Sequence, residues 1–410
     1  MSNYKILLGI TGSIAAYKSA YLISKLVQNG FDVKVAATEY ALKFIGKATL
    51  EGLTGNKVNT DSFEEGEMMS HINLVKWADI TVVCPASGNT INKLAAGIAD
   101  NLLTSLFLAH DWTKPYLVVP AMNTNMFEHP ATQESLKKLE SWGVEILPTA
   151  EGYLACGDTG KGKLLDPDEI YERILLASVS KQKPAEKLNV LITAGGTKED
   201  IDGIRYISNL STGNTAAQIA DYFLRRNHQV TYLHTADTKL PSVPCRLVRY
   251  NNFENLNEQL VNILNDKSMD VIIHNAAVSD YSPASLEVDG KKHPVPLSEK
   301  LDSDKNEMVI NLKKNPKIID HLKGYSKNKN IVIVGFKFTN SVSEEKRKEA
   351  VKKLFDNSKC NFVVLNDKND RDENNKQKGF SIYELVDKID ECSTSLQLAE
   401  KLETLLLKEK

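Results

Sequence analysis

Two short segments of the sequence carry side chains that could act on a carboxylic acid. Pro120–Asn123 (PAMN) ends in an amide, and Ala155–Asp158 (ACGD) contains a thiol. Each follows an apolar run, and parallel strands deliver the residues behind them to the ligand-binding edge of a sheet. An amide at such an edge can hold a carboxylate, and a thiol can hand over a proton. The two segments therefore add a particular chemistry to an otherwise generic nucleotide-binding pattern.

Glycine and hydroxyl residues follow the other strands predicted in the first half of the chain. The turn Gly9–Ser13 (GITGS) places Gly12 where the backbone could approach a ligand, and Ser13 where a hydroxyl could cap the next helix. Thr38 and the segment Pro85–Thr90 (PASGNT) follow two further strands. Because phosphates bind at helix starts, these groups together predict a mononucleotide site. For the glycine turn alone, a tight connection without a ligand is an equal alternative.

His71 stands alone in the stretch SHINLVKWAD, shortly before a predicted strand. A lone histidine is more often structural or solvent-exposed than catalytic. By the same reasoning Asn123 could simply cap a turn, and Cys156 could be an inert small residue. The apolar residues before Cys156 and the glycine after it instead favour a flexible flap that carries an exposed thiol.

The elements that must position these residues follow from hydrophobic periodicity. The first 180 residues alternate short, β-branched apolar runs with amphipathic stretches, which predicts a parallel sheet covered by helices on both faces. Strands are expected at residues 5–11, 32–38, 78–87 and 115–122, and helices at 13–30, 90–110 and 132–143.

The same pattern restarts after residues 181–187 (KQKPAEK), which are charged, contain a proline and are interpreted as a linker. Residues 188–410 again begin with a strand and a glycine turn, Ile192–Thr197 (ITAGGT). The predicted fold is therefore two doubly wound, Rossmann-like α/β domains with parallel sheets, over residues 1–180 and 188–410. Residues 280–305, rich in Pro, Ser, Lys and Asp, are expected to form a long mobile loop.

Polar and basic residues also follow the strands of the second half. Arg205 and Asn209 lie just before a predicted helix start, where a cation, an amide and a helix N-terminus could hold an anion. A surface arginine beside a capping serine is the plainer alternative. Asp280 ends another strand and is a candidate magnesium ligand or polar anchor. Lys348 and Lys352 share one helix face, as they would on a solvated helix.

Composition limits the class of protein. The chain has 410 residues, 42% of them hydrophobic, and a formal net charge of −2, which argues against an electrostatic nucleic-acid or membrane binder. The five cysteines are scattered without CxxC spacing, so neither a disulfide framework nor a zinc site is expected. A cytoplasmic location is expected instead. The start of the chain shows no targeting pattern, and no apolar run is long enough to cross a bilayer.

The first half resembles the flavin-dependent cysteine decarboxylases, and in particular the phosphopantothenoylcysteine decarboxylases. Five motifs carry the resemblance in order: GITGSIAAYK, the SHI…WAD segment, PASGNTINKLAAGIADNLL, PAMN and ACGD. The resemblance implies FMN, which oxidises the cysteine moiety of the substrate so that carbon dioxide can leave, and which then reduces the enethiol. Carried over residue by residue, His71 is the active-site histidine, Asn123 holds the substrate carboxylate and Cys156 protonates the enethiol. The positions implied near the flavin are Gly12, Ser13, Thr38, Ser87 and Asn89.

The second half resembles the phosphopantothenate–cysteine ligases along most of residues 188–410. The markers are GGT, RYISN with STG, NAAVSD, NPKI and VGF. In that family a nucleoside triphosphate activates the pantothenate carboxylate, which the cysteine amine then attacks. The resemblance implies Asn209 in the acyl-intermediate step, Arg205 on the substrate phosphate and Lys300 as the reactive loop lysine, with Mg²⁺ at Asp280. The remaining positions implied in substrate and nucleotide binding are Asn275, Ala276, Asp280, Lys314, Asn315, Pro316, Phe336, Lys348 and Lys352.

Three departures from the bacterial ligase pattern concern the nucleotide. The lysine-rich loop of the bacterial ligases matches this chain only at Lys300, and the alignment needs a gap there. Lys337 and Phe338 stand where the bacterial ligases usually have small residues. Asn214 stands where a lysine is usual. The residues after VGF are reminiscent of ATP-using eukaryotic ligases. CTP is expected from the fused architecture, with ATP as the close alternative.

Together the two resemblances imply a bifunctional enzyme of coenzyme A biosynthesis, with small-molecule substrates and an oligomer built from trimeric decarboxylase units and dimeric ligase units. A flavin-binding redox or regulatory protein without decarboxylase turnover is the alternative, against which His71, Asn123 and Cys156 argue. A pyridine-dinucleotide dehydrogenase is less favoured, because neither glycine turn reads GxGxxG.

Overall fold

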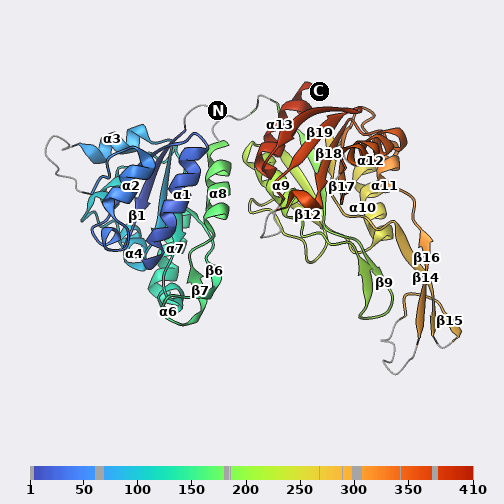
Figure 1. The fold of residues 1–410 in the computed structure, drawn as a ribbon, viewed down its shortest axis with the longest axis horizontal. Coiled ribbons are helices and arrows are strands. Elements are labelled where there is room, and N and C mark those ends of the chain that lie inside the picture. Colours follow the sequence, from blue (N-terminus) through green and yellow to red (C-terminus); the bar gives the residue numbers. More distant parts are fainter. Residues whose placement is uncertain are drawn as a thin grey trace. The chain divides into compact units, whose positions relative to one another are not determined.

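The computed structural model describes residues 4–60, 69–179, 184, 186–266, 268–288, 290–297, 307–341, 343–371 and 377–409. Lys300 and part of the predicted linker lie outside these residues. The chain divides into two compact units, Met1–Lys181 and Gln182–Lys410 (Figure 1). Each unit is described by itself.

The first unit is built on a five-stranded parallel sheet, as predicted. Its order is β2-β1-β3-β4-β5. The strands are β1 (Lys5–Ile10), β2 (Asp32–Ala37), β3 (Ile80–Ala86), β4 (Tyr116–Pro120) and β5 (Glu145–Ile146). Strand β1 lies between β2 and β3, and Gly9 pairs with Ala36 on one side and with Val83 on the other. Because all neighbouring strands run parallel, the residues that follow them meet at one edge.

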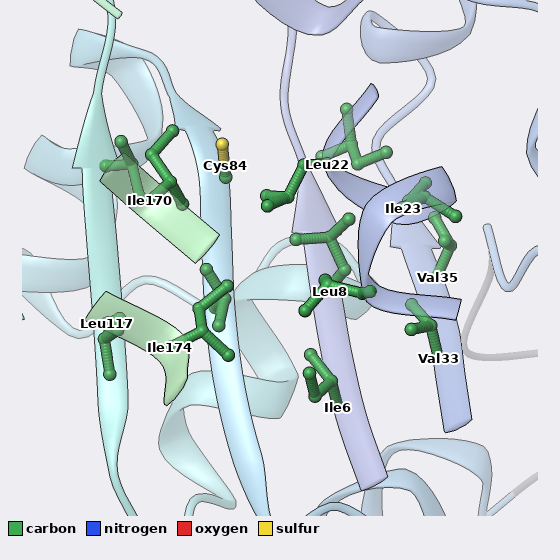
Figure 2. Close-up of a cluster of buried hydrophobic side chains, with 14 of the residues drawn as sticks. Ile6, Leu8, Leu22, Ile23, Val33, Val35, Cys84, Leu117, Ile170 and Ile174 are labelled. Atoms are coloured by element: carbon green, nitrogen blue, oxygen red, sulfur yellow. The ribbon is translucent and has the colours of Figure 1, made fainter. Parts of the chain in front are cut away.

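Alternate residues of β1 enter two different apolar clusters, which is why the strand reads as a continuous apolar run. Leu8 packs with Leu22 of α1 and Ile170 of α8 on one face of the sheet (Figure 2). Leu7 packs with Leu74 and Leu106 on the other face. Each fully buried leucine or isoleucine contributes about 1.5–3 kcal/mol relative to an exposed one. The helices are α1 (Tyr17–Gln28), α2 (Lys47–Thr54), α3 (Ser70–Trp77), α4 (Gly88–Ala96), α5 (Leu102–Leu108), α6 (Thr124–Glu128), α7 (Pro130–Ser141) and α8 (Pro167–Val179).

The single helix predicted over residues 90–110 is wrong, because two helices, α4 and α5, occupy this region. Gly97 ends α4 in the left-handed conformation, with φ of 69°. Asn101 then starts α5 with a reciprocal capping box to Thr104. A glycine at a C-cap and an asparagine at an N-cap are stop and start signals that apolar periodicity alone does not report.

The second unit contains an eight-stranded sheet with the order β12-β11-β8-β13-β17-β18-β19-β20. The first six strands run parallel, and β19 and β20 continue antiparallel. The strands are β8 (Asn189–Ala194), β11 (Gln229–His234), β12 (Arg246–Arg249), β13 (Val271–His274), β17 (Val332–Thr339), β18 (Phe362–Asp367), β19 (Phe380–Glu384) and β20 (Asp387–Cys392). The helices are α9 (Asn214–Arg225), α10 (Phe253–Asp266), α11 (Ile318–Tyr325), α12 (Glu344–Asn357) and α13 (Ser395–Lys408). The predicted α/β class is thereby confirmed for both units.

The loop predicted over residues 280–305 is wrong for its described part. The strands β14 (Tyr281–Val288) and β15 (Lys291–His293) form an antiparallel sheet with β16 (Met308–Lys314). This arm extends away from the main sheet of its unit, as does the hairpin of β9 (Lys198–Asp200) and β10 (Tyr206–Ser208) (Figure 1). The polar composition that suggested a loop does not prevent strand pairing: Ser282 and Ser285 of β14 are buried together with Leu286 and Val288.

A buried carboxylate on α13, the last helix of the second unit, is hydrogen-bonded to three residues in and just after α9. Glu403 of α13 accepts hydrogen bonds from the hydroxyl of Tyr222 (2.8 Å) and from Nε of Arg226 (2.9 Å). Nε2 of His228 lies 2.7 Å from the same carboxylate, while Nδ1 of His228 accepts the backbone N–H of Leu188. Because Nδ1 is an acceptor, Nε2 carries the proton and donates it to Glu403. Burial opposes ionisation of Glu403, but the three donors outweigh burial and lower its pKa.

Candidate functional site

Thr11 joins the ends of β1 and β3 at the carboxyl edge of the first sheet. Its fully buried hydroxyl donates to the carbonyl of Pro85 (2.7 Å) and accepts the backbone N–H of Ser87 (2.8 Å). Ser13, two residues later, donates to the carbonyl of Ala121 behind β4 (3.3 Å). Three strand ends are thus tied together by side-chain hydroxyls, and the turn that follows β1 is held against its neighbours.

The predicted flavin-binding residues gather at this edge. Ser13 caps a short 3-10 helix (Ile14–Ala16), Ser87 caps α4, and the hydroxyl of Thr38 accepts the backbone N–H of Ala41. Asn89 is exposed in the first turn of α4. A helix of this length presents free N–H groups and a partial positive charge at its start, which suits an anion.

Gly12 makes a close approach to Tyr40; the predicted approach to a ligand at this glycine stays a prediction. A Cβ atom on Gly12 would lie 2.6 Å from Cβ of Tyr40, closer than two carbon atoms can approach. The two turns that follow β1 and β2 are therefore in contact at Gly12, and no other residue fits there without moving Tyr40.

Asn123 and Cys156, thirty-three residues apart, are in direct contact. Nδ2 of Asn123 lies 3.2 Å from Sγ of Cys156 and 3.1 Å from Oδ2 of Asp158. The thiol in turn lies 3.3 Å from the same carboxylate oxygen. We call these three side chains the Asn–Cys–Asp triangle. Asp158 was quoted in the ACGD motif but was not predicted as a site residue, because its proximity to Asn123 exists only in the folded chain.

The thiol is carried by a hairpin of β6 (Ala150–Tyr153) and β7 (Thr159–Lys163). The hairpin is docked against the segment that bears Asn123: the N–H of Met122 donates to the carbonyl of Gly162 (2.9 Å), and Thr124 donates to the carbonyl of Lys161 (2.8 Å). A Cβ on Gly162 would meet the carbonyl oxygen of Met122 at 2.4 Å. The sequence predicted a flexible flap that carries an exposed thiol. In the structure the thiol of Cys156 is exposed, and the hairpin that carries it is hydrogen-bonded to the segment that bears Asn123.

His71 lies in the first turn of α3, a helix that packs against β1 and α5. Its Nδ1 atom is buried and has no hydrogen-bond partner within the described residues. A buried ring nitrogen without a partner is costly, so a group bound to this nitrogen would stabilise it.

The carboxyl edge of the second sheet is closely packed around its glycine turn. A Cβ on Gly196 would lie 2.3 Å from the backbone carbonyl oxygen of Asn209, so this glycine lets the backbone of Asn209 pack against the turn. Nδ2 of Asn209 donates to the carbonyl of Val278 (3.2 Å), and the N–H of Ala277 donates to the carbonyl of Gly195 (2.8 Å). Asn209 is thereby placed between the ends of β8 and β13.

Asn275 and Ala276 directly follow β13 at this edge. The N–H of Ala276 donates to the hydroxyl of Thr193 (3.1 Å), whose oxygen also lies 3.0 Å from Nδ1 of His274. Burial lowers the pKa of His274 to about 4, so the imidazole is neutral near pH 7. A neutral histidine and a hydroxyl thus fix the backbone of the predicted nucleotide-binding residues.

Asp280 is paired with a lysine, and no metal ligand accompanies it. Its carboxylate forms an ion pair with Lys317, and its backbone carbonyl accepts the N–H of Asn315 (2.9 Å). Asn315 is buried and donates to Ser282 (2.7 Å). Within the described residues there is no group of three or more His, Cys, Asp or Glu side chains that could hold a metal ion.

Lys337 is a half-buried cation at the same edge. Gly335 of β17 pairs with His274 of β13, so Lys337 follows at the level of Ala276. Burial, and next the charge of Lys317, lower its pKa, and within the described part of the chain its ammonium makes no hydrogen bond or ion pair. Sequence comparison marked Lys337 as a departure from the bacterial pattern but assigned it no role.

The other predicted ligase residues are spread over several elements of the second unit. Arg205 lies in the hairpin turn between β9 and β10, and its Nε donates to Asp202 (2.8 Å). Lys348 forms an ion pair with Glu344 on α12 (3.1 Å). Lys314, Pro316 and Lys352 are exposed, and Phe336 is half-buried.

Both units match known families. A family described as "Flavoprotein" matches residues 1–177, and one described as "DNA/pantothenate metabolism flavoprotein C-terminal domain" matches residues 185–405. The "Coenzyme A biosynthesis bifunctional protein CoaBC" of Borreliella burgdorferi is 34% identical, over 89% of this chain and 89% of that protein. The protein of the same name from Bacillus subtilis is 33% identical, over 90% of this chain and 86% of that protein.

A solved structure, "The FMN binding protein AtHal3", is 36% identical over 42% of this chain and 96% of that one, with a TM-score of 0.38. Among the described helices none has the length and apolar character of a membrane span. The two family matches, together with relatives aligned over nearly their whole length, confirm the resemblance of both halves. The chain belongs to the family of coenzyme A biosynthesis bifunctional proteins, which join a flavoprotein decarboxylase to a ligase.

Proposed function

We propose that residues 188–410 join 4′-phosphopantothenate to cysteine, and that residues 1–180 decarboxylate the resulting 4′-phosphopantothenoylcysteine to 4′-phosphopantetheine. These would be successive steps toward coenzyme A. The observation that supports the decarboxylase assignment most directly is the 3.2 Å contact between the amide of Asn123 and the thiol of Cys156 at the edge of a flavoprotein sheet. One ligand at this contact would meet both a carboxylate-binding group and a proton donor.

FMN is the cofactor that the first edge fits. The N-terminus of α4 and the turn at Ser13 offer backbone N–H groups to a phosphate, with Thr38 and Asn89 beside them. Gly12 keeps that turn free of a side chain. Bound FMN would supply the two-electron oxidation of the substrate thiol, which gives the electrons of the departing carboxylate an acceptor.

The chain's own residues would bind the carboxylate and move a proton. In the proposal Nδ2 of Asn123 holds the carboxylate that is lost. After carbon dioxide has left, the S–H bond of Cys156 breaks, a C–H bond forms at the carbon that carried the carboxylate, and solvent returns a proton to the thiolate. His71 is proposed as an active-site group, since its buried Nδ1 has no hydrogen-bond partner among the described residues and a bound ligand would satisfy it.

In the ligase unit the proposal is that Asn209 acts at the activated carboxylate. This is supported by its backbone contact with the turn at Gly196 and by the hydrogen bond of its amide to Val278. Arg205 binds the substrate phosphate and would have to exchange its contact with Asp202 for that ligand. The nucleotide lies along the edge formed by Asn275, Ala276 and Asp280. The additional nucleotide-binding positions are Lys314, Asn315, Pro316, Phe336, Lys348 and Lys352, and Lys300 remains the proposed reactive lysine outside the described residues.

Several finer points belong to the same proposal. CTP is the expected nucleotide and ATP the alternative. The single carboxylate of Asp280 does not make a metal site by itself, so Mg²⁺ is proposed only as part of the metal–nucleotide complex, and no step is derived through it. A cytoplasmic location, trimeric decarboxylase units and dimeric ligase units also stay predictions.

The test is product analysis by mass spectrometry with 4′-phosphopantothenate, cysteine and either CTP or ATP. With FMN present, we expect 4′-phosphopantetheine and one pyrophosphate for each ligation. Release of pyrophosphate without decarboxylation would remove the function of the first unit. Bound flavin without any turnover would support the redox or regulatory alternative instead.

A further inference from the structure

We infer that Asp158 is an internal stand-in for the substrate carboxylate: in the ligand-free protein it occupies the Asn123 amide, and substrate must displace it. The inference rests on the proposed decarboxylase function and deepens it. Its basis is the Asn–Cys–Asp triangle, in which one carboxylate oxygen of Asp158 lies 3.1 Å from Nδ2 of Asn123 and 3.3 Å from Sγ of Cys156.

The Asn123 amide has only one orientation open to it. Its Oδ1 atom accepts the backbone N–H of Asn125 (2.8 Å), because Asn123 is the N-cap of α6. A flip of the amide would point the NH₂ group at that N–H and leave two donors facing each other. Nδ2 is therefore fixed toward the hairpin, and any carboxylate held by Asn123 must reach it from that side.

The backbone of Asp158 is held in place by the hairpin turn, and its side chain remains able to rotate. The N–H of Leu154 donates to the carbonyl of Asp158 (2.8 Å), and Gly157 takes a φ of 92°, which returns the chain within a short turn. Cys156 and Asp158 consequently project from one tight turn. The hairpin contacts at Gly162 and Lys161 then place both side chains beside Asn123.

Two carboxylates cannot share this amide at no cost. Substrate brings a negative charge to Nδ2, where Asp158 already accepts a hydrogen bond and where the two charges would repel one another. Asp158 must then turn away from Asn123, while its contact with the thiol is free to persist. Asp158 thus acts as a positioning residue that lowers affinity for any ligand bearing the carboxylate and leaves affinity for the decarboxylated product unaffected.

The experiment uses two ligands that cannot react. They are the serine analogue of the substrate, whose hydroxyl replaces the thiol, and the corresponding ethanolamide, which lacks only the carboxylate. Isothermal titration of each into the FMN-loaded full chain gives a ratio of dissociation constants. The variants are D158N, which removes the charge with little change of shape, and D158E, which keeps the charge. Flavin absorbance checks that each variant retains its cofactor.

We expect D158N to bind the serine analogue about 3- to 10-fold more tightly than wild type, with no change for the ethanolamide. D158E should keep the wild-type ratio. An unchanged ratio in D158N, or equal tightening for both ligands, would overturn the inference. If wild type binds neither ligand and does not decarboxylate the cysteine compound, the proposed function fails instead, so the two failures are distinguishable.

Discussion

The two sheet edges of this protein differ in whether their proposed functional groups contact one another or are paired with other residues of the chain. At the first edge Asn123 and Cys156 already touch, and the surrounding hydroxyls are fixed by backbone hydrogen bonds. At the second edge several charged groups have internal partners: Arg205 contacts Asp202, Asp280 contacts Lys317 and Lys348 contacts Glu344. An amide and a thiol can be prebuilt in contact, with only the Asp158 carboxylate for the substrate to displace, whereas cations intended for a phosphate need counter-ions until the ligand arrives.

The largest effect is expected from replacing the thiol of Cys156 at the first sheet edge. Cys156→Ser should reduce formation of 4′-phosphopantetheine by on the order of 10²–10⁴, because the proton donor is lost while the triangle keeps its shape. Flavin absorbance should remain, and ligation should continue at the wild-type rate. Cys245→Ser, at a half-buried cysteine of the second unit, is the matched control. Normal output from Cys156→Ser would remove the thiol from the mechanism.

The corresponding change at the second edge is Asn209→Asp. The carboxylate would face the carbonyl of Val278, to which Asn209 now donates, and would also repel an acyl-nucleotide. We expect nucleotide-dependent pyrophosphate release to fall by about 10²-fold. Decarboxylation of supplied 4′-phosphopantothenoylcysteine should continue. Loss of both activities would indicate misfolding and would contradict the separate roles of the two edges.

Removing the buried carboxylate of α13 should weaken the second unit alone. Glu403→Gln loses the charge that accepts three hydrogen bonds, and we expect a loss of about 2 kcal/mol in the free energy of unfolding, measured by urea titration of ligase activity. The folded protein lowers the pKa of Glu403, so its contribution is complete above the ordinary glutamate pKa and is lost as pH falls through the lowered value. Flavin release should be unaffected in the same titration. A variant whose stability equals that of wild type between pH 4 and pH 7 (about the range in which glutamate ionises) would argue against this role.

The smallest expected effect is at Lys337. Within the described residues the half-buried ammonium of Lys337 makes no hydrogen bond or ion pair, although the charge of Asp280 acts on it. It is therefore available to a nucleotide phosphate, and Lys337→Gln should raise the KM for nucleotide by about 3- to 10-fold. Because burial lowers the pKa of Lys337, its charge is lost at a lower pH than that of an ordinary lysine. The KM should therefore rise on the alkaline side earlier in wild type than in Lys337→Arg. Lys401→Gln, on the exposed surface of α13, is the control, and an equal effect of the two glutamine variants would contradict a specific role.

Much of the fold could be predicted from local pattern. Apolar strands separated by helices indicated parallel sheets in both units, and glycine turns behind β1 and β8 lie where the pattern put them. The pattern failed where two signals had to be weighed against each other. Gly97 and Asn101 divided a helix that apolar spacing made continuous, and an antiparallel arm had the composition of a loop.

The sequence by itself determined which chemical groups stand behind which strands, because strand order along the chain and the residues that end each strand are local properties. It therefore predicted Asn123, Cys156 and the glycine turns. Only the tertiary structure decided which groups touch. The contact of Asp158 with Asn123, the counter-ion of Asp280 and the charges of Lys317 and Asp280 that act on Lys337 all depend on residues far apart in the chain. A hydrogen bond or an ion pair requires atoms within about 3–4 Å, and only the packing of strands and hairpins fixes distances on that scale.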